Sequence, residues 1–92
     1  MTLQERKNIL EIQLGTIFSD LQKIDDDIKC IDQRIKNLNE EMTRTGDFSS
    51  IQLEWEELTW DKWMYTQKKE QKLLLADEKL EEMKQLHNHT LT

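Results

Sequence analysis

An unbroken heptad repeat of apolar residues is the feature that most restricts how this chain can fold. Its positions step by four and three residues without exception, and they are Leu10, Leu14, Ile17, Leu21, Ile24, Ile28, Ile31, Ile35, Leu38 and Met42. Because this spacing places all of these side chains on one stripe of an α-helix, the repeat predicts a long helix that packs along that stripe against another helix.

Both ends of this first helix carry sequence signals. Thr2 is followed three residues later by Glu5, which is the spacing of a capping box that satisfies two amide donors. Gly46 is the first residue suited to the left-handed conformation that closes many helices. The sequence therefore predicts a helix from about residue 3 to about residue 45.

A turn is predicted at residues 46–49, near the middle of the chain. Ser49 can cap the amide of Gln52 while Gln52 reaches back, and Phe48 and Leu53 have the spacing of a hydrophobic staple. We expect a second helix from about residue 50 to about residue 87, followed by a frayed tail over residues 88–92.

The apolar stripe of the second helix is less regular than that of the first. It reads Ile51, Trp55, Leu58, Lys62, Tyr65 and Lys69, and then Leu73, Ala76, Leu80, Met83 and His87. A step of four residues replaces one of three between the two halves of the stripe. This pattern predicts a stutter, which locally unwinds a supercoil without breaking the helix.

A turn near the middle of the chain predicts that the two helices pair in antiparallel orientation. Leu21 would then face Leu73, and Ile17 would face Ala76. The expected ion pairs are Asp25 with Lys69, Asp26 with Lys68, Asp32 with Lys62, Lys36 with Glu57 and Glu11 with Lys84. Such exposed pairs each contribute only a few tenths of a kcal/mol, so they specify the alignment more than the stability.

We therefore predict one all-α domain over residues 1–92, an antiparallel two-helix hairpin of coiled-coil type. The composition agrees, because the chain contains no proline and 35% of its residues are charged. The predicted intrachain seam consists of Leu10, Leu14, Ile17, Leu21, Ile24, Ile28, Ile31, Ile35, Leu38, Trp55, Leu58, Tyr65, Leu73, Ala76, Leu80 and Met83.

The second helix has more apolar residues than one seam can bury. Leu53, Trp60, Trp63 and Met64 lie far from the seam by helical periodicity, and Ile9 and Ile12 lie away from it on the first helix. We predict that these six residues form an interface with a partner, because exposed tryptophans are typical anchors of interfaces. The simplest cover is a second hairpin in a dimeric four-helix bundle. An antiparallel twofold arrangement would bring the Trp60 patch of each hairpin against Ile9 and Ile12 of the other, and a parallel arrangement is the alternative.

Composition and spacing argue against several other classes of protein. The single cysteine, Cys30, cannot form an internal disulfide and falls at an outer heptad position. Asp25, Asp26 and Asp27 point about 100° apart on a helix, so they cannot converge on a metal ion. His87 and His89 are two residues apart and equally unsuited. We expect no metal, no cofactor and no enzymatic activity, because a narrow hairpin offers no deep pocket.

The same sequence features bear on location and function. No apolar run of about 18 residues is present, and the N-terminus does not resemble a signal peptide, which predicts an intracellular protein, cytoplasmic or nuclear, with no membrane span. The leading expectation is a protein-interaction module that acts as an adaptor, assembly chaperone or inhibitor. Its partner would be a second copy or another helical protein.

The alternative is a regulator linked to nucleic acid, although a net charge of −6 makes nucleic acid an unfavourable partner. One variant is an RNA-binding hairpin dimer whose basic strip would comprise Arg34, Lys36, Lys62, Lys68, Lys69 and Lys72. The other is an acidic mimic of DNA, whose carboxylates would be Asp25, Asp26, Asp27, Asp32, Glu56 and Glu57.

Overall fold

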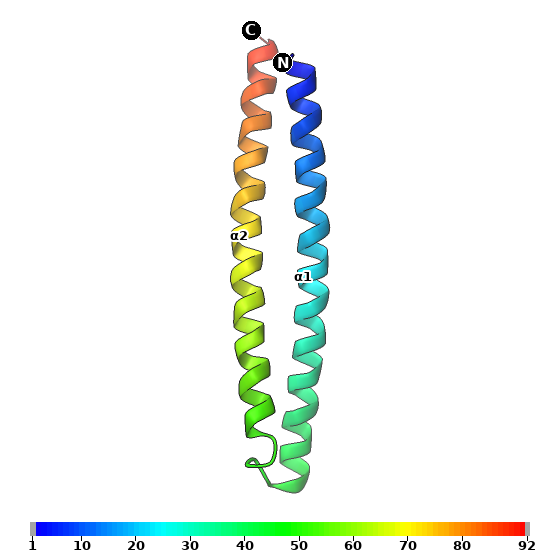
Figure 1. The fold of residues 1–92 in the computed structure, drawn as a ribbon, viewed down its shortest axis with the longest axis vertical. Coiled ribbons are helices and arrows are strands. Elements are labelled where there is room, and N and C mark those ends of the chain that lie inside the picture. Colours follow the sequence, from blue (N-terminus) through cyan, green and yellow to red (C-terminus); the bar gives the residue numbers. More distant parts are fainter. Residues whose placement is uncertain (1, 92) are drawn as a thin grey trace. The chain divides into compact units, whose positions relative to one another are not determined.

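The computed structural model describes residues 2–91, with side chains described through Asn88. Two long helices account for nearly all of these residues, α1 over Leu3–Thr45 and α2 over Gln52–Leu91 (Figure 1). No strand occurs between residues 2 and 91. The predicted all-helical class is confirmed, and two long helices joined by a short connection are consistent with a helical hairpin.

Both ends of α1 use the predicted residues. The Thr2 hydroxyl accepts a hydrogen bond from the Glu5 amide at 3.1 Å, so it replaces the carbonyl that a first-turn amide lacks. At the other end, Gly46 has a φ of 72°, and its amide donates to the Met42 carbonyl at 2.7 Å. This is a helix closure in the left-handed conformation, which glycine adopts without a steric penalty.

The connection into α2 differs from the prediction. The Ser49 hydroxyl does not cap Gln52 but donates to the Asp47 carboxylate at 2.8 Å, and the Ser50 hydroxyl donates to the Asp47 carbonyl at 3.4 Å. The Gln52 side chain donates to Glu56 at 3.1 Å rather than reaching back. A turn over residues 49–51 therefore precedes α2, which begins two residues later than predicted.

Asp47 is the residue that organises this turn. The hydrogen bond from the Ser49 hydroxyl lowers the pKa of the Asp47 carboxyl below its ordinary value of 3.8, against desolvation that raises it. The amides of Ser50 and Ser49 and the Ser50 hydroxyl lower this pKa further. Phe48 packs edge-on against Trp55 at 6.1 Å between ring centroids, whereas its predicted partner Leu53 is 70% exposed. The aromatic contact replaces the predicted staple.

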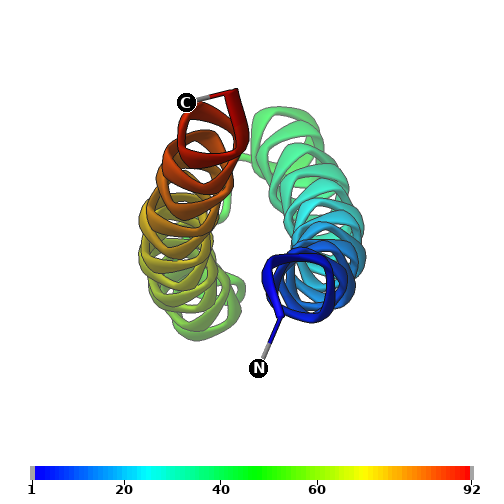
Figure 2. The same ribbon diagram turned by 90° about the horizontal axis from the view of Figure 1, so that it is seen from above.

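The chain divides into two compact units. Unit 1 combines α1 up to Lys23 with α2 from Glu70 onward, and unit 2 is the continuous segment Ile24–Lys69 that contains the connection. In each unit a segment of α1 packs beside a segment of α2. For unit 1 this is visible in Figures 1 and 2, where the blue start of α1 lies beside the orange and red end of α2.

The core of unit 1 comes mainly from the α1 heptad repeat. Leu14, Ile17 and Leu21 form a buried cluster with Ala76 of α2, and Met83 packs against this cluster. Leu10 is also buried, with 3% of its surface exposed. In unit 2, Leu38 and Ile51 are buried, while Ile24, Ile28, Ile31 and Ile35 are half-buried. A pair of helices can bury only a narrow stripe of each partner, so the remaining seam side chains stay partly open to water.

The seam of α2 contains no stutter. Along the seam, buried and half-buried side chains recur in uninterrupted steps of four and three residues, at Ile51, Trp55, Leu58, Lys62, Tyr65, Lys69, Lys72, Ala76, Lys79, Met83 and Leu86. Glu54, Thr66, Gln67 and Glu82, beside these positions, are also half-buried. Leu73 and Leu80, which were predicted in the seam, are instead 44% and 47% exposed. The lysine stems can lie along the seam with their ammonium groups in water, so the helix keeps its regular repeat.

Two of the predicted ion pairs are confirmed in unit 2. Lys69 lies 2.7 Å from Asp25, and Lys62 lies 2.6 Å from Asp32. Two further pairs were not predicted, Arg34 with Glu54 at 2.6 Å in unit 2 and Lys72 with Asp20 at 3.1 Å in unit 1. Within unit 2, Asp25 pairs with Lys69 and the later Asp32 pairs with the earlier Lys62, which is the antiparallel order.

Three further differences concern Glu11, Lys68 and the end of α2. Glu11 lies 4.0 Å from Lys7, one turn away on the same helix, and Lys68 lies over the Tyr65 ring. The helix α2 extends through Leu91, past the predicted end near residue 87, because neither glycine nor proline follows Gly46 to interrupt it. Of the predicted frayed tail, residue 92 lies outside the described residues.

Candidate interaction surface

Four large apolar side chains of α2 are exposed in unit 2, and we call them the tryptophan face. Leu53 is 70% exposed, Trp60 58%, Trp63 54% and Met64 38%. Their spacing places them away from the seam positions Trp55, Leu58 and Tyr65, which face α1. The periodicity of α2 therefore directs two indoles and two aliphatic side chains toward solvent.

The two exposed tryptophans are ordered by their contact with each other. Their ring centroids are 5.1 Å apart with an interplanar angle of 26°, which is a stacked arrangement between residues one turn apart. Together with Trp55, Glu56 and Thr59 they line an open hollow of about 370 Å³. The Thr59 hydroxyl is engaged with the Trp55 carbonyl at 2.8 Å, so the floor of this hollow offers mostly apolar surface.

The other two predicted interface residues lie in unit 1. Ile9 is 41% exposed and Ile12 is 70% exposed. Ile12 lines a groove together with Leu75 of α2, and the Asp20 and Lys72 ion pair lines the same groove. This second surface contains two of the predicted residues rather than four, and no aromatic side chain lines its groove.

Several exposed apolar residues were not predicted as interface residues. Phe18 is 50% exposed and Leu74 is 64% exposed, in addition to Leu73 and Leu80. Leu73 and Leu80 were assigned to the seam because a stutter gave a more apolar stripe than an uninterrupted repeat with lysines. The unbroken spacing from Ile51 to Leu86 was the signal that could have placed them outside the seam.

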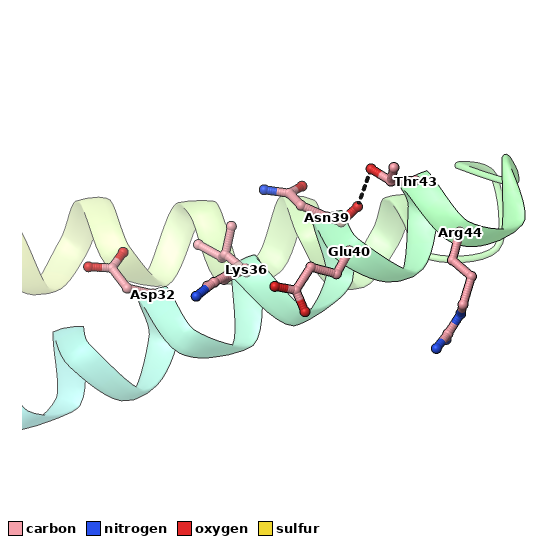
Figure 3. A pocket seen from close by; sticks show the side chains of 7 residues that line it. Asp32, Lys36, Asn39, Glu40, Thr43 and Arg44 are labelled. Atoms are coloured by element: carbon pink, nitrogen blue, oxygen red, sulfur yellow. Dashed lines mark hydrogen bonds between the residues drawn. The ribbon is translucent and has the colours of Figure 1, made fainter.

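A different hollow, lined mostly by residues with polar or charged side chains, lies along α1 in unit 2 (Figure 3). Asp32, Lys36, Glu40 and Arg44 follow one another at successive turns with alternating charge, and the Thr43 hydroxyl donates to the Asn39 carbonyl at 2.9 Å. The hollow has a volume of about 580 Å³ and is lined by one helix alone. Its alternating charges favour neither an anion nor a cation.

The charged residues considered for nucleic-acid binding are largely engaged within the chain. Lys62, Lys69, Lys72 and Arg34 each contact a carboxylate, which reduces the charge that a basic strip could offer to phosphates. The same contacts occupy Asp25 and Asp32 of the acidic set. Over the described part of the chain, no group of three or more His, Cys, Asp or Glu side chains is placed to hold a metal ion.

The fold and the surface define a class of protein, a paired-helix chain with an exposed aromatic face. In the described part of the chain, neither helix is both long enough and apolar enough to cross a membrane. Comparison of the chain with models of protein families, with curated proteins and with solved structures found no match.

Proposed function

We propose that this chain is a protein-interaction module that assembles by covering its tryptophan face with another helix. The observation that carries the proposal is the exposure of Trp60 and Trp63, stacked on each other with more than half of each side chain open to water. Exposed patches of this kind mark interaction sites on otherwise polar proteins. In this role the chain acts as an adaptor, assembly chaperone or inhibitor and carries out no catalysis.

The hydrophobic free energy of burial favours covering the tryptophan face. Covering the exposed half of one indole removes roughly 100 Å² from water, which is worth about 2.5 kcal/mol by area. The ion pairs on the same helix contribute far less, because exposed pairs are worth about 0 to 1 kcal/mol each. The tryptophans therefore dominate the association energy that this surface can supply.

A second copy is the simplest partner, and two hairpins would then form a four-helix bundle. Such a bundle is the arrangement in which a coiled-coil hairpin buries both its own seam and a second stripe. We also place the module inside the cell, in the cytoplasm or nucleus, because its single cysteine, Cys30, is an exposed free thiol suited to a reducing compartment.

Light scattering of the full chain from low micromolar to submillimolar concentration tests the proposal. We expect the mass to rise to that of an oligomer, and we expect Trp60→Glu to abolish this rise. Phe18→Glu is the matched control, because Phe18, which is 50% exposed, is nearly as exposed as Trp60 but lies outside the tryptophan face. The proposal would be overturned if neither Trp60→Glu nor Trp63→Glu changed the assembly of the chain, whether the chain is purified or in native extract.

A further inference from the structure

The edge of the tryptophan face carries charges with an ordered polarity. Glu57, Asp61, Met64 and Lys68 follow one another along α2 in steps of four, three and four residues, so they form one row beside Trp60. The row is acidic toward the start of α2 and basic at its other end. Its three charged members are exposed.

These three charges are not neutralised by ion pairs inside the described part of the chain. Three other charged residues of α2 in unit 2 do form ion pairs with α1: Glu54 with Arg34, Lys62 with Asp32 and Lys69 with Asp25. Lys68 instead lies 5.2 Å from the centroid of the Tyr65 ring, which leaves its ammonium open to a carboxylate. Glu57 and Lys68 thus flank the apolar centre as charges of opposite sign.

We propose that the tryptophan face of unit 2 binds the same face of a second copy, with the two α2 helices antiparallel and the twofold axis near residues 62 and 63. This inference rests on the function proposed above and specifies its partner and orientation. Antiparallel pairing about this point places Trp60 against Met64 of the second copy and Glu57 close to Lys68 of the second copy. The twofold symmetry of the dimer makes each of these two contacts occur twice.

The charge pattern selects this orientation over the parallel one. In a parallel twofold pair the two copies of this edge row lie on opposite sides of the pair, so Glu57 and Lys68 of one copy do not reach the row of the other. The parallel orientation therefore gives these charges no attraction to one another across the interface. An antiparallel pair places the two rows on the same side and brings Glu57 of each copy close to Lys68 of the other, and the thioether of Met64 is a favourable neighbour for an indole ring.

Cross-linking of the full chain tests the orientation. In a Cys30→Ser background, Glu57→Cys and Lys68→Cys are made as separate single-cysteine proteins and treated with a short bis-maleimide, alone and mixed. We expect cross-links between position 57 and position 68 in the mixture and almost none in either protein alone. Cross-links within each protein alone would place like positions beside one another and overturn the inference.

The other outcomes separate this inference from the proposed function. A dimer by light scattering that yields no cross-link between 57 and 68 means that the copies meet through another surface, which overturns the inference and leaves self-association standing. A monomer at every concentration overturns the inference together with the second copy as partner. Assembly that requires a different protein, with Trp60 still essential, overturns the inference alone.

Charge reversal provides an independent test that needs no cysteine. Glu57→Lys should weaken the dimer about tenfold, because two symmetric attractions become repulsions. Adding Lys68→Glu to the same chain should restore the dissociation constant to within about threefold of wild type. Glu41→Lys on α1 is the matched control and should leave it unchanged. Failure of the double substitution to restore affinity would contradict the antiparallel arrangement.

Discussion

The Lys72 ammonium lies 3.1 Å from a carboxylate oxygen of Asp20, at a seam position of unit 1 where a heptad repeat usually carries an apolar side chain. The two side chains are 38% and 34% exposed, so the pair is only partly desolvated. Water screens an ion pair of this kind, and its net contribution is small. The seam therefore tolerates a lysine without deriving much stability from it.

Replacement of Lys72 by methionine should accordingly leave the free energy of unfolding unchanged or raise it by up to about 1 kcal/mol, since apolar seam contact offsets the lost pair. Lys72→Glu should instead lower it by about 1 kcal/mol through repulsion with Asp20. Urea unfolding monitored by circular dichroism measures both. Lys84→Glu, at an exposed position of the same helix segment, serves as the control, with an expected change within about 0.5 kcal/mol. A loss above about 2 kcal/mol for Lys72→Met would show that the ion pair is essential.

Leu21 and Leu73 should differ strongly in their response to truncation. Leu21 is 8% exposed in the core of unit 1, and Leu21→Ala should cost about 2 to 4 kcal/mol. Leu73 is 44% exposed, so Leu73→Ala should cost less than about 1 kcal/mol in the monomer. Equal losses in a thermal or urea melt would indicate that α2 adopts the stutter after all.

The two glycines should respond to alanine with opposite signs. Gly46 has a φ of 72°, where a Cβ is strained, so Gly46→Ala should lower the stability by about 1 kcal/mol. Gly15 lies inside α1 with open space where the methyl group of an alanine would stand, so Gly15→Ala should raise the stability by up to about 1 kcal/mol. Melting temperatures of the two variants measure the effect, and a stabilising Gly46→Ala would contradict the left-handed closure of α1.

The contribution of Asp47 to the free energy of unfolding should depend on pH. Its pKa is lowered in the folded chain, so the folded chain binds fewer protons at this carboxyl than the unfolded chain does in acid. Its contribution is therefore present above the ordinary value of 3.8 and is lost as the pH falls through the folded pKa. Asp47→Ala should thus be less stable than wild type at pH near neutrality, and the difference should shrink in acid. Ser50→Ala, which keeps the carboxylate, should retain the acid dependence. A difference that is constant with pH would contradict the role of the charged form.

Most of the fold could be predicted from local sequence. The α1 heptad repeat, the Thr2 cap and the Gly46 closure each depend on residues close together in the chain, and the structure contains all three. The ion pairs of Asp25 and Asp32 followed from the position of the turn alone. These features were predictable because helix geometry fixes which residues share a face.

The remaining features depend on competition between neighbours that sequence spacing cannot rank. Ser49 and Asp47 both could accept amide hydrogen bonds in the turn, and the carboxylate prevailed because a charged acceptor bonds more strongly. In α2, the apolar Leu73 and the amphipathic Lys72 competed for the seam. The long stem of Lys72 allowed the regular repeat to continue, which left Leu73 exposed.

The aromatic contacts of unit 2 give the chain an intrinsic optical reporter. Trp55 is half-buried and touches Phe48 edge-on, whereas Trp60 and Trp63 are stacked and open to water. The three indoles therefore occupy two environments, one already shielded and one that water and small quenchers can reach. The ratio of the two fluorescence components follows how much of the tryptophan face is covered, without any attached dye.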